Sequence, residues 1–577
     1  MEEKTPTWGL VPKPRSIIKT VEWFPSLVKV EGDFWNKKNE KGEHPVRRAY
    51  LKAAHPYEEY KDTDPEINAR MEFARYQTLG LSYLDTAEDE NEKRIVITKA
   101  GKELIATENK EEVILRQLLK LQFPSNIHSS ARYAEMRVFP LEIILHVLHQ
   151  FGIVNRLEIA FSVFTCTGIN DIDNVFSKIR EFRKLVEGKP ANKHRKIFLD
   201  NFEKYNGDTG NKPETYLGNY DDVLFRHLEY TSIFETSGRG EFTKLYVPDR
   251  SKIKFKQLFE KYRFEFFDEY KNIEKFYEYF GNPYATTLPW ENKESLTEIV
   301  DYKLNILKTK GREHKIGQVL TALEMDDLQT LEVQLNSEIL EVNEKEFIEK
   351  ISKTKVERQK IIDKFIDIDS GDEDLSALWL EVNTWKSLVA MQGTHYVKRN
   401  FKIELDLTPR SFASGTNSTP DMELYNQKYI IIPEVSIQSG VQQWITEGSS
   451  VVEHVLKFLE IKNGKKFPGI EDVEAHMNPD NIQSVYGFFL CRKINERLLW
   501  QMYVLNKEAW LGEPVAVVPM EIKSYLKVIR FMYDKELPAL HFEELVEDLA
   551  QAAQESEDFR KWQEMQNSII NDFLTAK

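Results

Sequence analysis

Two acidic residues near position 430 have the spacing that a metal-dependent hydrolase needs. Pro420-Asp421 stands at the start of an expected strand, and Glu434 closes the apolar run that begins at Tyr429. A hairpin over this segment places the two carboxylates side by side at the edge of a sheet. Such oxygen ligands suit Mg²⁺, which can polarise a phosphodiester and lower the pKa of an attacking water. The structural alternative is a turn residue at 421 and an exposed edge charge at 434.

This spacing is similar to the PD-(D/E)xK nuclease motif, with one departure at the third position. Ser436 stands where the motif has lysine. Because alternate residues of a strand point to the same face, the Ser436 hydroxyl lies beside Glu434 but supplies no positive charge. The stretch that follows must compensate, and a carboxylate there favours a second metal ion. The candidates are Gln438, Gln442, Gln443 and Glu447.

Two hairpins in the first half of the chain are expected to be wings of winged helix-turn-helix units. In the first, residues 82–84 and 94–97 form strands around a charged tip, and Thr98 caps the next helix. In the second, a helix at 220–230 leads to a wing at 232–247. The alternative is a pair of ordinary hairpins in an α+β domain.

Cationic residues gather before the second hairpin. Residues 176–196 hold eight of them against two glutamates. Such a run is usually a solvated helix face, but beside a wing it favours contact with phosphates. Lys178, Arg180 and Arg183 fall within about a turn and a half of one helix, and we expect them to add non-specific affinity for DNA.

Three further arginines are candidates for DNA contact. Arg226 lies on the helix before the second wing, where an arginine can bind guanine with two hydrogen bonds in the major groove. A plain surface cation is the alternative. Arg239 at the wing tip is expected at phosphate or in the minor groove, and Arg15 on an arm against the backbone.

The rest of the chain changes character twice. Gly281-Asn282-Pro283 breaks the preceding helix, residues 296–365 have the pattern of long amphipathic helices, and the last third alternates strands with helices. Buried strands are expected there at 429–432, 485–490 and 515–518. The predicted fold is multidomain α+β, with winged-helix recognition subdomains, a helical linker and a C-terminal PD-(D/E)xK-type α/β nuclease core. The predicted parts are 1–118 and 119–270 (recognition), 271–298 (linker) and 299–577 (cleavage; helical to about 395, nuclease core from about 396).

Composition sets outer limits on these interpretations. The chain has 577 residues, 41% of them hydrophobic, and a formal net charge of −15, which at face value argues against a nucleic-acid binder. A protein that is acidic overall can still bind DNA if its recognition face is basic. Cys166 and Cys491 are the only cysteines, which favours a reducing cytoplasm. The most apolar run, 141–154, is too short to span a membrane.

The chain resembles the AlwI-like family of type IIS restriction endonucleases, which includes related site-specific nicking endonucleases. The resemblance extends over nearly the full length of the sequence. The segments that carry it are Pro14-Arg15-Ser16, Glu31-Gly32-Asp33-Phe34-Trp35, Ile97 to Lys102, Lys120 to Ser125, Phe276 to Pro283, Pro420-Asp421-Met422-Glu423 and Glu434-Val435-Ser436.

The resemblance implies a metal site as well as an architecture. Asp421 and Glu434 would bind Mg²⁺, with the Val435 carbonyl as a further ligand. Glu447 would orient the attacking water or support a second metal, and Glu381 would bind or buffer the cluster. Members of this family also lack the motif lysine and usually have a small hydroxyl residue there, so the serine is no sign of an inactive copy.

The expected function is that of a Mg²⁺-dependent type IIS restriction or nicking endonuclease in the bacterial cytoplasm. It would bind a short asymmetric duplex site, like the GAGTC- or GGATC-type pentanucleotides of the family, and leave 5′-phosphates a fixed distance outside it. Cleavage of both strands would need a transient dimer or a partner subunit, and a companion methyltransferase would act on the same site. The alternatives are a catalytically silent winged-helix DNA-binding regulator, a metal-dependent hydrolase of another substrate and a helical scaffold.

Overall fold

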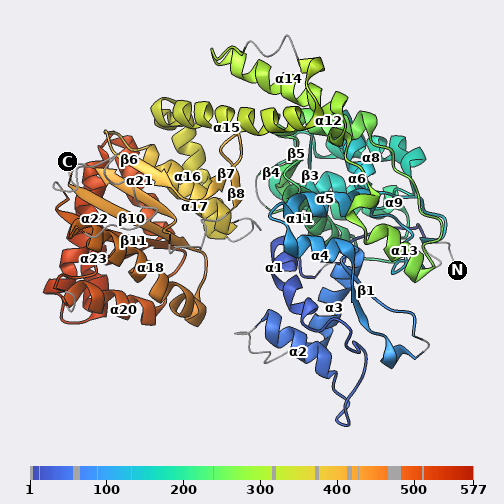
Figure 1. The fold of residues 1–577 in the computed structure, drawn as a ribbon, viewed down its shortest axis with the longest axis horizontal. Helices are drawn as coiled ribbons and strands as arrows, with labels where there is room; N and C mark the ends of the chain where they lie inside the picture. The colour runs from blue at the N-terminus through green and yellow to red at the C-terminus, as the bar shows by residue number, and fades with distance from the viewer. Residues whose placement is uncertain are drawn as a thin grey trace. The chain divides into compact units, whose positions relative to one another are not determined.

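The structure, a computed structural model, divides the chain into two compact units, Met1–Leu335 and Asn336–Lys577. Both are mostly helical with small sheets, so the fold is mixed α+β (Figure 1). Among the described residues, no helix combines the length and apolar character required to cross a bilayer. The described residues are 4–11, 13–55, 65–87, 89–130, 133–237, 240–314, 320–370, 376–411, 419–426, 428–464, 482–509 and 512–575.

The first subdomain of unit one alternates helices with a small hairpin. Its elements are α1 (Ile17–Val28), α2 (Pro45–Ala54), α3 (Pro65–Thr78), β1 (Ser82–Leu84) and β2 (Ile95–Ile97). β1 and β2 pair antiparallel, and Phe34 forms a bridge to Arg94 beside them. α4 (Lys99–Ala106) then begins where the Thr98 side chain accepts a hydrogen bond from the Gly101 N–H, which confirms the predicted cap.

The second subdomain repeats this order with an insertion. Its three-stranded sheet has the order β3-β5-β4, and every pair in it is antiparallel. The insertion between the second and third helices consists mainly of α8 (Ile172–Val186) and α9 (Ala191–Asn206). The repeated elements are α6 (Pro140–Phe151), β3 (Ile153–Asn155), α7 (Arg156–Ser162), α11 (Asp221–Tyr230), β4 (Glu235–Ser237) and β5 (Lys244–Tyr246).

The predicted linker at 271–298 is a packed part of unit one. α13 (Ile273–Phe280) buries Phe276, Tyr277 and Phe280 in the same core as the two subdomains. Aromatic side chains at this spacing form an apolar helix face that must be covered, so this segment packs against the core. The division between the units falls at residue 335, and not near the predicted 299.

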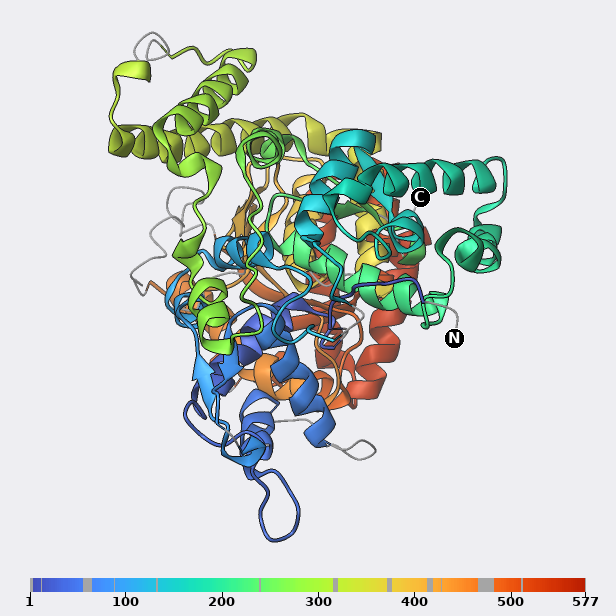
Figure 2. The same ribbon diagram turned by 90° about the vertical axis from the view of Figure 1, so that its right-hand side faces the viewer.

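Long helices occupy the middle of the chain, as the sequence predicts. They are α14 (Lys293–Thr309), α15 (Met325–Glu349) and α16 (Lys355–Ser370). In the turned view of Figure 2, α14 lies beside the beginning of α15. Lys303 and Glu332 join these two helices through a hydrogen-bonded ion pair of 2.5 Å.

Unit two is built on a five-stranded sheet of order β12-β11-β10-β9-β6. β10, β11 and β12 run parallel, while β9 pairs antiparallel with both β10 and β6. The strands are β6 (Tyr396–Arg399), β9 (Met422–Asn426), β10 (Tyr429–Ser436), β11 (Ser484–Cys491) and β12 (Val517–Glu521), and they confirm the three strands predicted at 429–432, 485–490 and 515–518.

Both faces of this sheet are buried. Ile430 and Ile432 of β10 enter the core formed with α18 (Gly440–Lys462) and α20 (Glu496–Lys507). Ile431 between them enters the opposite core, formed with α17 (Ser376–Val389), α21 (Ile522–Asp534) and α22 (Ala539–Glu555). Strands covered on both sides read as unbroken apolar runs, which is why they were visible in the sequence.

Candidate active site

The hairpin of β9 and β10 brings the two predicted carboxylates together. Its register pairs Asn426 with Tyr429 and Leu424 with Ile431, and continuing that register sets Asp421 opposite Glu434. The carboxyl groups of Asp421 and Glu434 are in hydrogen-bond contact. The Val435 N–H also donates to Asp421 Oδ2 at 2.9 Å. The spacing of thirteen residues is therefore the spacing at which the two strands of this hairpin place their acids face to face.

The electrostatics of the pair are those of acids forced together out of water. Burial raises the pKa of Asp421 well above its ordinary value, and the neighbouring charges of Glu434 and Glu447 raise it further. Burial, followed by the charge of Glu447, raises the pKa of Glu434 in the same direction. The Val435 N–H opposes part of the shift at Asp421. Two such carboxylates ionise together at low cost only when a cation neutralises them.

Ser436 and Glu447 form the next layer of the site. The Ser436 hydroxyl is hydrogen-bonded to the Glu447 carboxylate, and burial raises the pKa of Glu447. The Gln438 N–H donates to Ser436 Oγ at 3.1 Å. The serine at the motif's lysine position is thus held between the chain that leaves β10 and the third carboxylate on α18.

The glutamines that were candidates to replace the lysine make local hydrogen bonds around the start of α18. Gln438 Oε1 accepts a hydrogen bond from the Thr446 hydroxyl at 2.6 Å. Gln443 is buried, and its Nε2 donates to the carbonyls of Gln438 and Lys493 at 3.1 and 3.2 Å. These amides fix the entry into α18, so they position Glu447 without supplying charge.

His454 is a site residue that the sequence analysis missed. It lies on α18, and its Nδ1 is 2.5 Å from Glu434 Oε1 in a buried contact. Burial, followed by the charge of Lys457, lowers the pKa of His454. Glu447 and His454 are seven residues apart, which places them on the same face of a helix. That spacing, next to the expected metal ligand, was the signal that could have found it.

The donor set fits a hard divalent cation held partly by the protein. Within the described ranges, no group of three or more His, Cys, Asp or Glu side chains forms a ready metal site. Mg²⁺ commonly uses only one or two carboxylates and completes its shell with waters and substrate phosphates. The pair of Asp421 and Glu434 supplies that minimum, and burial together with the neighbouring acids raises both of its pKa values.

Glu381 lies on α17, apart in sequence from the hairpin. Its side chain is buried, with 6% exposed, and α17 packs against β10 and β6. It is therefore on an element next to the site, and its part in the acidic cluster stays a prediction.

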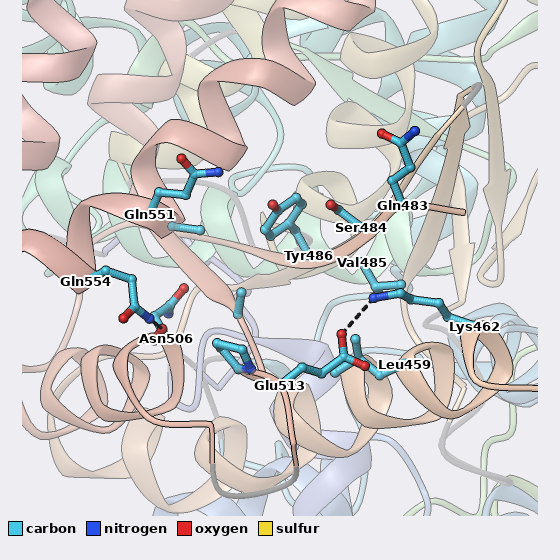
Figure 3. Close-up of a pocket in the computed structure, with 13 residues that line it drawn as sticks. Leu459, Lys462, Gln483, Ser484, Val485, Tyr486, Asn506, Glu513, Gln551 and Gln554 are labelled. Carbon is cyan, nitrogen blue, oxygen red and sulfur yellow. Dashed lines mark hydrogen bonds and ion pairs between the residues drawn. The ribbon is translucent and has the colours of Figure 1, made fainter. Parts of the chain in front are cut away.

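A separate hollow lies at the other end of the parallel strands (Figure 3). It has a volume of about 230 Å³ and is lined by Ser484 at the start of β11, with Asn506 and Tyr486. Lys462 and Glu513 form an ion pair of 2.7 Å at this hollow. The carboxylate pair belongs to the opposite ends of these strands, so this hollow is not part of the candidate active site.

Comparison with known families identifies the family of this chain. The family model described as AlwI restriction endonuclease matches residues 78–528. The chain belongs to that family. It is a site-specific deoxyribonuclease of type II, and the carboxylate hairpin lies within the matched region.

Among curated proteins no match was found. Solved structures give distant likenesses. The small subunit of the heterodimeric restriction endonuclease R.BspD6I is 17% identical, with a TM-score of 0.28, over 37% of this chain and 98% of that one. The BpuJ1 endonuclease binding domain in complex with modified DNA is 11% identical, with a TM-score of 0.30, over 48% and 97%. Restriction endonuclease FokI is 11% identical, with a TM-score of 0.26, over 94% and 98%.

Only part of the predicted basic stretch of this endonuclease is exposed to solvent. Lys178 is 8% exposed, its Nζ donates to Thr165 Oγ1 at 2.9 Å, and burial lowers its pKa, so the prediction of a surface phosphate contact is wrong for this residue. Arg183 is held by Glu158 at 2.6 Å. Arg180 is exposed and stays a candidate.

The three other arginines predicted to contact DNA also differ in their exposure and hydrogen-bond partners. Arg226 is partly buried, and its Nε donates to Asp222 Oδ2 at 3.0 Å. Arg15 is exposed, and its guanidinium donates to Asn219 Oδ1 at 3.0 Å. Arg239 lies outside the described residues.

Proposed function

We propose that this endonuclease is a Mg²⁺-dependent type IIS enzyme that binds a short asymmetric duplex site and hydrolyses phosphodiester bonds a fixed distance outside it. The observation that carries the proposal is the facing pair of the half-buried Asp421 and the buried Glu434, whose pKa values are raised by burial and by neighbouring acids. The hairpin has the arrangement of the PD-(D/E)xK motif, with one acid at the start of one strand and another near the end of the next. We therefore assign unit two a PD-(D/E)xK-type core.

The residues around the pair have distinct tasks in this proposal. Asp421 and Glu434 would hold the cation, with the Val435 carbonyl as a further oxygen ligand. When bound, the cation supplies electrostatic stabilisation of the charge that develops on the phosphate. His454 fixes the orientation of Glu434 through the 2.5 Å contact. Glu447, hydrogen-bonded to Ser436, is placed to accept a proton from the attacking water.

The element order of unit one supports winged-helix recognition. In both subdomains a helix is followed by a strand or bridge, two further helices, and a pair of antiparallel strands. This is the order of a winged helix-turn-helix, which presents its last helix to the major groove. Recognition in unit one and catalysis in unit two imply a cut displaced from the bound site, as type IIS cleavage requires.

One carboxylate hairpin hydrolyses one strand at a time. A double-strand break therefore requires a second copy of unit two or a partner subunit, and without one the product is a nick. Supercoiled plasmid distinguishes these outcomes, because a nick gives the open circle and a double-strand cut gives the linear form.

The test is cleavage of a plasmid of known sequence with Mg²⁺ or with EDTA. We expect cleavage with Mg²⁺ alone, and sequenced ends at a constant distance from one short sequence. Asp421→Asn should abolish cleavage and retain binding in a gel shift, while Glu508→Gln, at an exposed position of the same unit, should cleave normally. Cleavage in EDTA, or full activity of Asp421→Asn, would contradict the proposal.

A further inference from the structure

The last helix of the second subdomain offers little surface to a base. In α11, residues 221–225, His227 and Leu228 are buried. α1 and α5 (Lys110–Lys120) pack against it. Arg226 is its partly exposed cation, and Asp222 already engages it. A helix enclosed in this way has few side chains free to contact base edges.

α3 occupies the corresponding place in the first subdomain, and one of its faces is open. It follows α2 and precedes β1, as the recognition helix of a helix-turn-helix does (Figure 1). Its inner face buries Ala69, Phe73 and Tyr76. Its outer face exposes Arg70, together with 47% of the Ile67 side chain.

The inner face of α3 is fixed by polar contacts as well as by packing. Glu72 accepts a hydrogen bond from the Tyr50 hydroxyl at 2.6 Å and contacts His55 Nε2 at 3.0 Å. One turn from Glu72, Arg75 is 1% exposed and donates to the carbonyls of Val11 and Pro14. A helix held along one side presents its other side at a defined position, which sequence reading requires.

Arg70 is the available cation on that open face. Among the described residues it makes no hydrogen bond or ion pair. Arg48 on the neighbouring α2 is instead engaged by Glu43 at 3.0 Å and Glu66 at 3.2 Å. An arginine without an internal partner has its guanidinium fork free for the O6 and N7 acceptors of guanine.

The hairpin beside α3 indicates how DNA would approach. Its tip carries Asp89, Glu90 and Glu92, whose charges repel phosphate. Contact through this tip is therefore unfavourable, and the approach that charge favours is along the open face of α3. Ile67 on the same face supplies the apolar contact that the methyl group of thymine takes.

We infer that Arg70 is a specificity-determining residue, which binds one guanine of the recognition site in the major groove with Ile67 beside it. This inference rests on the proposed function, because it takes winged-helix recognition of a short duplex site as given. It assigns base reading to the first subdomain, in addition to whatever Arg226 contributes.

The experiment maps the ends that the full-length enzyme produces with Mg²⁺ on a long DNA of known sequence. The variants are Arg70→Ala, Arg70→Lys and, as a matched control, Arg180→Ala on α8. Arg70→Ala should cleave the wild-type site roughly 5- to 150-fold more slowly, and the mapped sites should become degenerate at one G·C pair. Arg70→Lys should do the same while the salt dependence of binding is retained, because charge is kept and the fork is lost. Arg180→Ala should weaken all sites equally.

The outcomes separate the two levels of the proposal. Wild-type ends scattered without a fixed sequence would overturn the proposed function and this inference together. A fixed wild-type site that stays fully specified in both Arg70 variants would overturn the role of Arg70 alone. Thermal unfolding of each variant shows whether it is folded, and the exposed position of Arg70 predicts wild-type stability.

Discussion

Replacing Asp421 with asparagine should make the metal-free protein more stable while it removes catalysis. The asparagine keeps an oxygen that can accept the Val435 N–H, which donates to Asp421 Oδ2 at 2.9 Å in the wild type. It removes the carboxyl group that burial and the charges of Glu434 and Glu447 make costly to ionise. The variant therefore changes one electrostatic interaction and leaves the hydrogen-bond geometry nearly as it was.

The magnitude follows from the contact between the two carboxyl groups. Two like charges about 4 Å apart repel by about 4 kcal/mol at an effective dielectric constant of about 20. The wild-type pair escapes part of this repulsion by binding a proton, as the raised pKa values of Asp421 and Glu434 indicate. We expect the variant to gain about 1–3 kcal/mol at pH 7.5 without a divalent cation.

The assay is thermal unfolding of the full chain in EDTA and in Mg²⁺. A gain of this size raises the Tm of a unit the size of unit two by about 2–4 °C per kcal/mol. Added Mg²⁺ should stabilise the wild type, because binding at a hundred times the Kd adds about 2.7 kcal/mol to the free energy of unfolding. The Tm of the wild type should rise accordingly, and the Tm of the variant should stay nearly unchanged. Glu508→Gln removes an exposed charge of the same unit and should match the wild type in both conditions.

A lower stability of Asp421→Asn than of the wild type in EDTA would contradict this expectation. That result would mean that Asp421 acts chiefly as a hydrogen-bonded turn residue. An equal Mg²⁺ response in the variant and the wild type would likewise show that the cation binds elsewhere.

Three further outcomes are expected. His454→Gln should reduce cleavage by about 10- to 100-fold with little change in DNA binding, since partners that orient metal ligands have effects of that size. Single-turnover cleavage and gel shifts measure the two effects, and equal losses of cleavage and of binding would refute this role. Ser436→Ala should slow cleavage through Glu447, to which the serine is hydrogen-bonded, and an unchanged rate would refute that link. Burial raises the pKa of Glu543 to about 7, so the stability it contributes when protonated is lost as pH rises from about 4.5 to 7. Glu543→Gln should therefore add about 1–3 kcal/mol at pH 8 and little at pH 4.5, measured by thermal unfolding against the exposed Glu508→Gln. The opposite pH trend would contradict it.

The sequence predicted the elements of the carboxylate hairpin. Apolar runs marked β10 and β11 because both faces of the sheet are covered, and the turn between β9 and β10 is short enough to fix the register. Thr98 marked a helix start because a side-chain cap is a local interaction. Patterns of this kind depend on neighbours within one or two turns of the chain.

The positions of the cations were harder to predict for the opposite reason. Lys178 was counted as a surface charge, and burial beside Thr165, thirteen residues earlier, overturned that. Arg183 and Glu158 are twenty-five residues apart, and their pairing depends on how α7 packs against α8. Residues 271–298 looked like a linker because of their breaker, although their aromatic face is covered by distant helices.

For this endonuclease, the sequence by itself determined which acids can meet, because strand pairing across a short hairpin is set by counting residues. Tertiary packing alone decided what surrounds them. His454 reaches Glu434 because α18 packs against β10 and β11. The same is true of recognition, where packing encloses α11 and leaves the outer face of α3 open. Spacing along the chain cannot reveal this, since exposure depends on elements far away in the sequence.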